Sequence, residues 1–295
     1  MTHGFLILAH KETDALYYFI ETILSEPRAR VYLHLDSKCT DETLLLHYVS
    51  NKRVTIMPRH NLAWAHQSII YQELRMIETA YLDGCDLFWI CSGDDGFCQP
   101  IAECLDFVET HGDKNFIAVR PFLPHRLFYY NLGVRKQGRQ FPKGWQRKFL
   151  LWQMKNFKIR KIPYQKFAMG SQWCTINRTF AKFLINEGKT WRFRKTFFAS
   201  YMADEVFIPL LARAFGFPLF STKPQYETLK NNFRLVDFSE SDVETNAPPK
   251  TFGFADQDKV LSSGAWICRK VDNDLAKELY YLNRKEKCRL TSIKN

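Results

Sequence analysis

This 295-residue chain contains two short acidic motifs whose carboxylates could bind a metal ion. Asp94 and Asp95 are adjacent in the sequence. A second pair, Asp256 and Asp258, is separated by one residue and follows Gly253 in a predicted loop. An Asp-x-Asp motif after a strand can hold a divalent cation against a nucleotide diphosphate, because hard cations prefer carboxylate oxygens. A solvated turn is the plainer interpretation of the second pair, and the acidic residues alone leave both open.

Several common catalytic motifs are absent from the sequence. There is no glycine-rich dinucleotide fingerprint, no phosphate-binding glycine loop ending in Lys-Ser or Lys-Thr, and no Gly-x-Ser-x-Gly turn. The eight cysteines include no Cys-x-x-Cys pair and lack zinc-ligand spacing with a histidine. We therefore expect free thiols in a reducing compartment.

The first 120 residues alternate strand and helix patterns. Short apolar runs with polar flanks predict strands at residues 4–9, 31–36, 54–57, 87–91 and 116–119. Helical spacing of apolar residues predicts helices at 14–24, capped by Thr13 or Asp14, and at 67–81 and 101–110. Such alternation predicts an α/β fold with a mostly parallel sheet and helices on both faces. Ligands of such sheets bind at the carboxyl ends of the strands, where Asp36 and the Gly93–Gly96 turn are expected.

The chain after residue 168 continues with the same two kinds of element. The patterns predict strands at 172–176 and 233–236, helices at 179–187, 204–215 and 274–282, and a polar loop at 239–249. The helix at 204 begins with two acidic residues, Asp204 and Glu205.

Positive charge is concentrated in one segment between the two halves. The chain has a formal net charge of +11, and residues 126–166 hold twelve Lys and Arg with no Asp or Glu. Nine aromatic side chains are interleaved with these cations. Such a segment can hold an anionic membrane surface, bind nucleic acid, or form a solvated insertion. We favour the membrane surface and expect no nucleic acid.

No early apolar run is long enough to cross a membrane. The longest, residues 5–9, is also too short for the apolar part of a signal peptide. The sequence therefore predicts a cytoplasmic protein, peripheral at the inner face of the cytoplasmic membrane.

Further motifs follow one another along the chain. The first half contains Ile7-Leu8-Ala9-His10-Lys11, His34-Leu35-Asp36, Trp64-Ala65-His66-Gln67-Ser68 and Phe88-Trp89-Ile90-Cys91-Ser92-Gly93-Asp94-Asp95. The second half contains Gly170-Ser171-Gln172-Trp173, Asp204-Glu205, Phe233-Arg234 through Phe238, and Phe252-Gly253 through Arg269-Lys270-Val271-Asp272. In this order they resemble glycosyltransferase family 14, the core-2/I-branching β-1,6-N-acetylglucosaminyltransferases, which also includes peptide xylosyltransferases. The resemblance covers about residues 4–285, and the chain is similar to a bacterial-type member.

The resemblance implies a GT-A-like fold, with a Rossmann-type mixed sheet flanked by helices in a single domain over 1–295. Its parts would be a nucleotide-binding half at 1–120, the basic aromatic segment at 121–168, and an acceptor and catalytic half at 169–295. It also implies inverting transfer from a UDP-sugar, with no cofactor or metal required. Such a transfer needs a carboxylate base for the acceptor hydroxyl and positive charge for the departing diphosphate.

The resemblance makes Glu205 the base and leaves Asp204 as a cap or an orienting residue. The start of a helix lowers a carboxylate pKa, which would keep Glu205 ionised. The plainer alternative is that Asp204 caps the helix and Glu205 only complements its dipole.

Lys270 matches the diphosphate-binding lysine of the family, and a surface lysine is its plainer alternative. The second family cation, an arginine, falls near Ala247, so this chain departs from the pattern there. Three cations could replace it, namely Arg234, Lys250 and Arg269. If none of them does, a Mg²⁺ or Mn²⁺ ion would need the acidic residues Asp94, Asp95 or Asp258.

Four residues are expected at the donor. Asp36 matches a strand-end residue that faces the uridine, although it could simply form the turn before Ser37. His10 matches a residue at the end of the first strand, where the nucleotide lies, although a lone histidine is often structural. Asp95 matches a residue that reaches donor or acceptor hydroxyls, and Asp94 replaces the Gln or Met that is usual beside it.

Two aromatic residues are expected at the acceptor. Trp173 forms either the acceptor wall or part of the core. Phe238 falls where animal members place a tryptophan, and a phenylalanine keeps the stacking face but loses the indole N–H donor. We therefore expect a different acceptor, such as a lipid-linked oligosaccharide in bacterial surface polysaccharide or lipooligosaccharide synthesis, with N-acetylglucosamine as the transferred sugar. The alternatives are a nucleic-acid-binding module and a peptide xylosyltransferase-like activity. The sequence predicts no oligomeric state.

Overall fold

The computed structural model describes residues 1–63, 66–120, 148, 152, 164, 168–198, 200, 203–221, 232–238 and 249–293. Side chains beyond residue 285, Trp64, most of the basic segment 126–166 and most of the predicted loop 239–249 lie outside the described residues.

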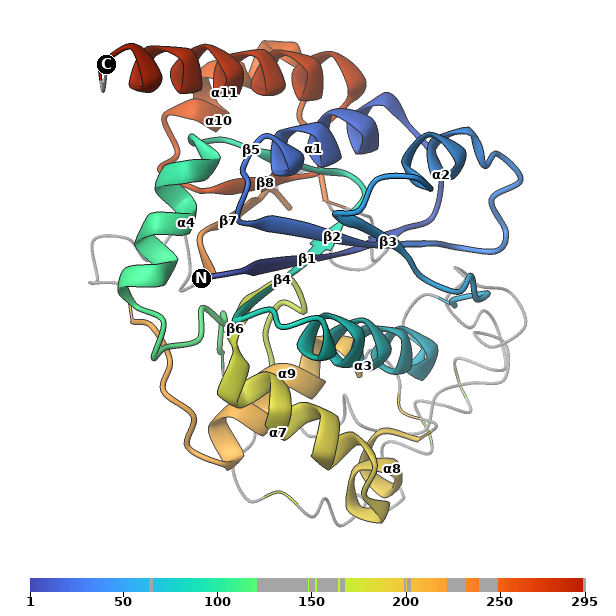
Figure 1. The fold of residues 1–295 in the computed structure, drawn as a ribbon. Coiled ribbons are helices and arrows are strands. Elements are labelled where there is room, and N and C mark those ends of the chain that lie inside the picture. The colour runs from blue at the N-terminus through green and yellow to red at the C-terminus, as the bar shows by residue number, and fades with distance from the viewer. Residues whose placement is uncertain are drawn as a thin grey trace.

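Five strands form the central sheet, in the order β3-β2-β1-β4-β6 (Figure 1). The parallel strands are β1 (His3–Ala9), β2 (Ala29–Leu35), β3 (Val54–Ile56) and β4 (Leu87–Ser92). The fifth strand, β6 (Thr175–Asn177), runs antiparallel to β4. The predicted α/β class, a Rossmann-type mixed sheet flanked by helices, is confirmed.

The predicted strand at 116–119 is wrong. Residues 115–120 pair with three separate partners through single bridges, to Leu219, Thr175 and Met169 in turn. Because no two consecutive residues share a partner strand, no continuous ladder forms there.

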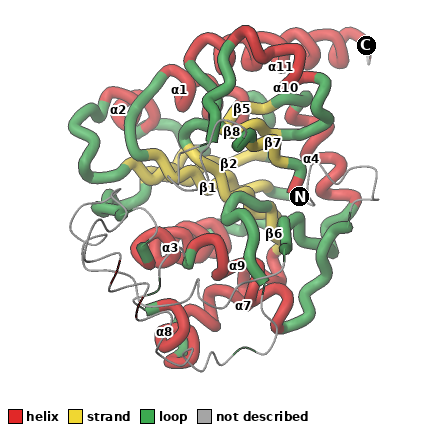
Figure 2. The backbone as a smooth tube through the Cα atoms, turned by 180° about the vertical axis from the view of Figure 1, so that it is seen from behind, coloured by secondary structure: helices red, strands yellow, loops and turns green. Residues whose placement is uncertain are grey.

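Helices cover both faces of the central sheet (Figure 1; Figure 2 from behind). One face carries α1 (Asp14–Leu24), α2 (Thr43–Tyr48) and α4 (Ile101–Thr110), and the other carries α3 (Gln67–Leu82), α7 (Arg178–Gly188), α8 (Trp191–Phe197) and α9 (Asp204–Ala214). Successive side chains of a strand point to opposite faces. Phe5 and Ile7 therefore pack in the core against α1, α2 and α4, while Leu6 packs in the core against α3, α7, α8 and α9.

Side-chain caps begin several of these helices. The Thr13 hydroxyl accepts a hydrogen bond from the backbone N–H of Leu16 at 3.1 Å, which confirms one of the two predicted caps of α1. Asn177 caps α7 and Thr190 caps α8 in the same way. Each cap satisfies a backbone donor that the first helical turn leaves without a partner, and such a cap contributes about 1 kcal/mol.

A second sheet contains three short strands, in the order β5-β8-β7. They are β5 (Asp95–Phe97), β8 (Ile267–Arg269) and β7 (Arg234–Val236), and they pack beside α11 (Asn273–Ile293). Of these three strands only β7 was predicted, because β5 begins inside the predicted Gly93–Gly96 turn and the residues of β8 were not assigned to any element. The predicted loop at Asp256–Asp258 is wrong, since η3 (Phe254–Asp256) and α10 (Gln257–Leu261) occupy it.

Two further expectations concern thiols and membrane spans. The seven described cysteines are free thiols, as predicted, and six of them are buried. In the part of the chain that the structure describes, no helix has both the length and the apolar character to cross a membrane.

A buried ion pair joins the two sheets. The Arg234 guanidinium on β7 lies 3.0 Å from the Asp95 carboxylate on β5, and the two side chains are 2% and 0% exposed. Arg234 also donates to the backbone oxygen of Ile90 on β4 at 3.1 Å, while Asp95 accepts from the N–H of Ser92 at 3.0 Å. One guanidinium and one carboxylate thus fix the small sheet against the end of β4.

We expect Arg234→Gln to lower the free energy of unfolding by about 3–5 kcal/mol, because it leaves the Asp95 carboxylate buried without its cation. The matched control is Lys259→Gln, which breaks an exposed ion pair with Asp237 and should cost less than about 1 kcal/mol. Urea denaturation of both variants measures the difference. Equal stability of the two variants would contradict the role assigned to the buried pair.

Candidate active site

The carboxyl ends of three parallel strands meet at one edge of the central sheet. The N–H of Asp36 donates to the Ala9 oxygen at 2.9 Å, and the N–H of Gly93 donates to the Leu8 oxygen at 3.0 Å. A Cβ on Gly93 would lie 2.8 Å from the Cβ of Ala9, so glycine permits this approach. His10 follows β1 directly and is half-buried. The strand order reverses here, with β2 and β4 on the two sides of β1, and such switch points form ligand crevices.

The Asp36 carboxylate forms the turn that follows β2. It accepts hydrogen bonds from the backbone N–H groups of Lys38 at 2.9 Å and Leu62 at 3.1 Å. The Lys38 ammonium lies 3.1 Å from the same carboxylate, which is 4% exposed. The structure thus gives Asp36 the turn-forming role that the sequence left open, and its contact with a uridine stays a prediction.

The small sheet brings two cations to the acidic turn after β4. Arg269 pairs with Asp95 in the register of β5 and β8, and its guanidinium lies 3.9 Å from the centre of the Trp173 ring. The Lys270 ammonium lies 3.6 Å from the Asp94 carboxylate. Sequence segments around residues 94, 173 and 270 therefore meet at one place.

Glu205 is positioned by a close contact between α9 and a glycine. The N–H of Gly170 donates to the backbone oxygen of Glu205 at 2.8 Å. A Cβ on Gly170 would lie 1.7 Å from the Ala118 oxygen, so no other residue fits without a shift of the backbone. The Glu205 carboxylate is 28% exposed and lies 3.7 Å from the Arg120 guanidinium. Sequence analysis missed Arg120, whose only signal was a cation directly after the predicted strand 116–119.

Asp204 is buried rather than capping its helix. The N-cap of α9 is Ala203, with no side-chain hydrogen bond, so the predicted cap is wrong: Asp204 already lies inside the first turn. Burial raises the pKa of Asp204 to about 7, with a further contribution from the neighbouring Glu205. The Arg269 guanidinium opposes this shift.

A second buried acid faces Asp204 from α3. Glu73 is 1% exposed, and neither of its carboxylate oxygens has a hydrogen-bond partner. Burial, then repulsion by Asp204, raises the pKa of Glu73 well above its usual range. Sequence analysis missed this residue as well, although an acid on the apolar face of the predicted helix 67–81 was a visible signal.

The candidate diphosphate cations lie in different surroundings. Arg234 forms a buried ion pair with Asp95, and the Lys250 ammonium lies 3.0 Å from the Asp256 carboxylate. Arg269 keeps one buried guanidinium nitrogen, Nη1, without a hydrogen-bond partner. Burial lowers the pKa of Arg269, while Asp95 and Asp94 oppose the shift.

The two other predicted contacts differ in exposure. Asp95 is fully buried, so it faces protein rather than solvent, and burial raises the pKa of its carboxyl against the effect of Arg234. Phe238 is 53% exposed. Among the described residues no group of three His, Cys, Asp or Glu side chains is arranged to hold a metal ion.

The assembled residues provide a partly exposed carboxylate, a buried acid beside it, and a pair of cations next to an aromatic ring. Comparison with known families decides what such a site belongs to, because residues 4–261 match the model of the family Branch: Core-2/I-Branching enzyme. The chain belongs to the core-2/I-branching enzyme family. The family that the sequence motifs indicated is confirmed, and the chain is a glycosyltransferase, for which the family implies a nucleotide-sugar donor and a glycan acceptor.

The solved structures that match include a distant one. The crystal structure of mouse xyloside xylosyltransferase 1, apo form, is 8% identical, with a TM-score of 0.34, and the alignment covers 90% of this chain and 97% of that one. No curated protein sequence matches this branching-family chain.

The raised pKa of Asp204 predicts a change of stability with pH. An acid whose pKa rises from 3.8 to about 7 on folding stays protonated to a higher pH in the folded state than in the unfolded state. Its contribution to stability is therefore lost as pH rises from about 4 to 7, and it changes little above that range. Asp204→Asn removes this titration, so the stability of the variant relative to the unchanged protein should increase across this window by up to about 4 kcal/mol.

Urea denaturation at a series of pH values measures this difference. The control is Asp258→Asn, which alters an exposed acid on α10. A constant stability difference between Asp204→Asn and the unchanged protein across the window would show that Asp204 ionises normally in the fold.

Proposed function

We propose that this glycosyltransferase moves a sugar, most simply N-acetylglucosamine, from a UDP-sugar to a hydroxyl of a glycan acceptor, with inversion at the anomeric carbon. The observation that carries the proposal is the arrangement of Glu205 with the Arg269–Lys270 pair. The carboxylate is partly exposed at the start of α9, and Arg269 at the end of β8 interacts electrostatically with the adjacent Asp204. Lys270 follows Arg269 in the chain and lies 3.6 Å from the Asp94 carboxylate.

Glu205 is proposed as the general base. Its carboxylate takes the proton of the acceptor hydroxyl while the acceptor oxygen bonds to the anomeric carbon of the donor. The bond from that carbon to the diphosphate oxygen breaks on the opposite side, and UDP leaves with the electron pair. Arg120, at 3.7 Å, favours the ionised form of Glu205, which a base requires. Asp204, with its raised pKa, limits the negative charge beside the base.

Arg269 and Lys270 are proposed to stabilise the departing diphosphate. Two cations can supply the charge compensation that a leaving diphosphate needs, without a metal ion. Arg269 fits this role better than Arg234 or Lys250. It alone among the three forms no ion pair with a described residue, and its Nη1 has no hydrogen-bond partner among them. The Trp173 ring holds its guanidinium in place through a cation–π contact.

The remaining parts of the proposal concern the donor nucleotide and the acceptor. His10 and Asp36 lie at the sheet edge where a uridine would bind, and the exposed ring of Phe238 would stack on a sugar. We propose a lipid-linked acceptor in bacterial surface polysaccharide or lipooligosaccharide synthesis, at the cytoplasmic face of an anionic membrane. The basic aromatic composition of residues 126–166 supports this location.

Slow hydrolysis of UDP-sugars tests the donor and the metal requirement together. The panel is UDP-N-acetylglucosamine, UDP-glucose, UDP-galactose, UDP-xylose and UDP-N-acetylgalactosamine, each with EDTA and with Mn²⁺. We expect UDP release from UDP-N-acetylglucosamine that EDTA does not reduce. Release only with Mn²⁺ would move the acidic residues into contact with a metal, and release from UDP-xylose alone would favour a xylosyltransferase. No release and no UDP binding would contradict the proposal.

Two substitutions test the roles of the base and of the diphosphate site independently. Glu205→Gln should reduce transfer by about 10²–10⁴-fold, because it removes proton abstraction, and should leave UDP affinity unchanged. Lys270→Ala should instead weaken UDP binding, measured by calorimetry. Glu103→Gln, an exposed glutamate of α4, is the control for both measurements. Normal turnover of Glu205→Gln would remove this residue from the mechanism.

A further inference from the structure

Helix α8 presents a basic and aromatic face to solvent. Four residues lie along one side of the helix and its C-cap, because they stand at positions i, i+3, i+4 and i+7. They are Trp191, Arg194, Lys195 and Phe198. All four are exposed, and the Trp191 and Phe198 side chains are 77% and 55% exposed. We call these four residues the α8 face.

The opposite side of α8 is fixed to the helix that carries Glu205. Phe193 and Phe197 are buried, and their rings lie 5.6 Å and 5.9 Å from the ring of Phe207 on α9. The exposure of Trp191 and Phe198 therefore does not come from a loosely attached helix. Both side chains are more than half exposed on a helix whose other two aromatic side chains are buried.

The charge around this face is strongly positive. Residues 178–198 contain six Lys and Arg and a single acid, Glu187. Glu187 is buried and bonded to Arg192 at 2.7 Å and to the Tyr164 hydroxyl at 2.7 Å, so it offers little negative charge to solvent. Neither Arg194 nor Lys195 forms an ion pair with a described residue.

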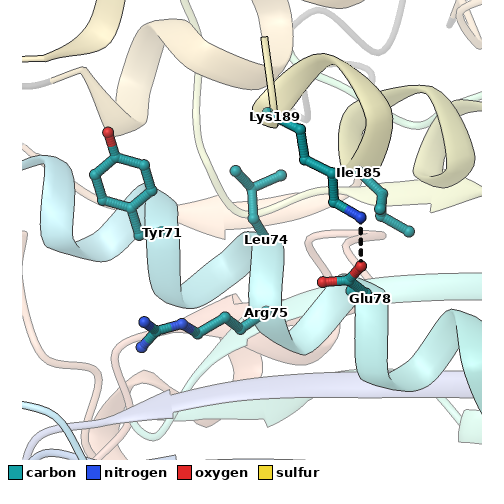
Figure 3. A pocket seen from close by; sticks show the side chains of 7 residues that line it. Tyr71, Leu74, Arg75, Glu78, Ile185 and Lys189 are labelled. Atoms are coloured by element: carbon teal, nitrogen blue, oxygen red, sulfur yellow. Dashed lines mark hydrogen bonds and ion pairs between the residues drawn. The ribbon is translucent and has the colours of Figure 1, made fainter. Parts of the chain in front are cut away.

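A surface hollow adjoins this basic region. Its volume is about 170 Å³, and it is lined by Tyr71, Leu74, Arg75, Glu78, Ile185, Gly188 and Lys189. Figure 3 shows the side chain of Leu74 between Tyr71 and the Lys189–Glu78 ion pair, whose length is 2.8 Å. Lys189 lies two residues before Trp191, so the hollow is next to the α8 face in the chain. Because Glu78 compensates the charge of Lys189, Arg75 is the cation that the hollow adds.

We propose that the α8 face docks the protein on an anionic lipid bilayer. Tryptophan and phenylalanine side chains insert at the boundary between headgroups and acyl chains, and Lys and Arg bind the anionic headgroups. The α8 face combines both kinds of side chain on one rigid surface with little competing negative charge. This complementarity in both charge and polarity is the reason to choose an anionic bilayer as the partner.

Docking through α8 would bring the reaction to the membrane. Phe198 precedes Asp204 by six residues, and α8 packs directly on α9 through Phe207. A bilayer bound at α8 therefore lies close to α9, whose first turn carries Glu205. This consequence rests on the proposed function, in which the acceptor is lipid-linked, but the docking itself can be tested without any sugar transfer.

Cosedimentation with lipid vesicles tests the docking. The whole chain is mixed with vesicles of phosphatidylcholine alone or of phosphatidylcholine with phosphatidylglycerol. We expect binding to the anionic vesicles only. Arg194→Gln/Lys195→Gln should weaken it about 25-fold, because each basic side chain near an anionic leaflet contributes about fivefold. Trp191→Ser/Phe198→Ser should weaken it roughly tenfold or more through the loss of apolar insertion.

Two matched double variants serve as controls. Leu46→Ser/Val49→Ser alters exposed apolar side chains of α2 and its C-cap, which are 70% and 67% exposed, and should bind as the unchanged protein does. Arg284→Gln/Lys285→Gln removes an exposed Arg-Lys pair from α11 and should do the same. Circular dichroism verifies that every variant is folded.

Three outcomes would overturn the proposal. The first is no binding of the unchanged protein to anionic vesicles. The second is equal binding by the α8 variants and their controls, which would assign the membrane contact to another segment. The third is displacement from vesicles by a single-stranded oligonucleotide that binds more tightly and depends on the same four residues, which would make the partner a nucleic acid. Because UDP-sugar hydrolysis is measured without vesicles, failure of docking would leave the proposed transferase activity standing.

Discussion

The buried pair of Arg234 and Asp95 is the interaction on which the arrangement of the site depends. Burying two charges is unfavourable unless each finds a well-placed partner, and these two also bond to backbone groups at the end of β4. The pair fixes the small sheet to the large one, and Arg269 lies in register with Asp95 on that sheet. Moving the small sheet would therefore carry Arg269 away from Asp204 on α9.

Differences in burial divide the acidic residues of the site by role. Asp95 and Glu73 are fully buried, Asp204 is nearly so, and Glu205 keeps more than a quarter of its side chain exposed. Burial disfavours the charged form of a carboxyl group, so the acids around Glu205 carry raised pKa values. Glu205 is the most exposed carboxylate of this group, which supports the general-base role proposed for it.

Much of the fold could be predicted from local sequence patterns. The helices at 14–24 and 101–110 were predicted with both ends as observed, because their apolar residues repeat at helical spacing next to a cap or a proline. Strands β5 and β8 were not predicted. β5 begins inside the Gly93–Gly96 segment, whose glycines indicate a turn, and it becomes a strand only by pairing with the distant β8. Arg120 and Glu73 were missed at the site for another reason. Their significance comes from contacts with α9, and neither residue stands near Asp204 or Glu205 in the sequence.

The sequence by itself determined the family, the strands β1 to β4 and the helices α1, α3 and α4 of the first half, and the position of Asp204-Glu205 at the start of a helix. These depend on residue types and spacing over short distances. Only the tertiary structure decided that Asp204 is buried rather than a cap and that Arg234 forms an ion pair. It also decided that Arg269 stacks on Trp173 while its Nη1 has no hydrogen-bond partner among the described residues. The physical reason is that burial and pairing belong to the surroundings of a side chain, which residues distant in the chain provide only after folding.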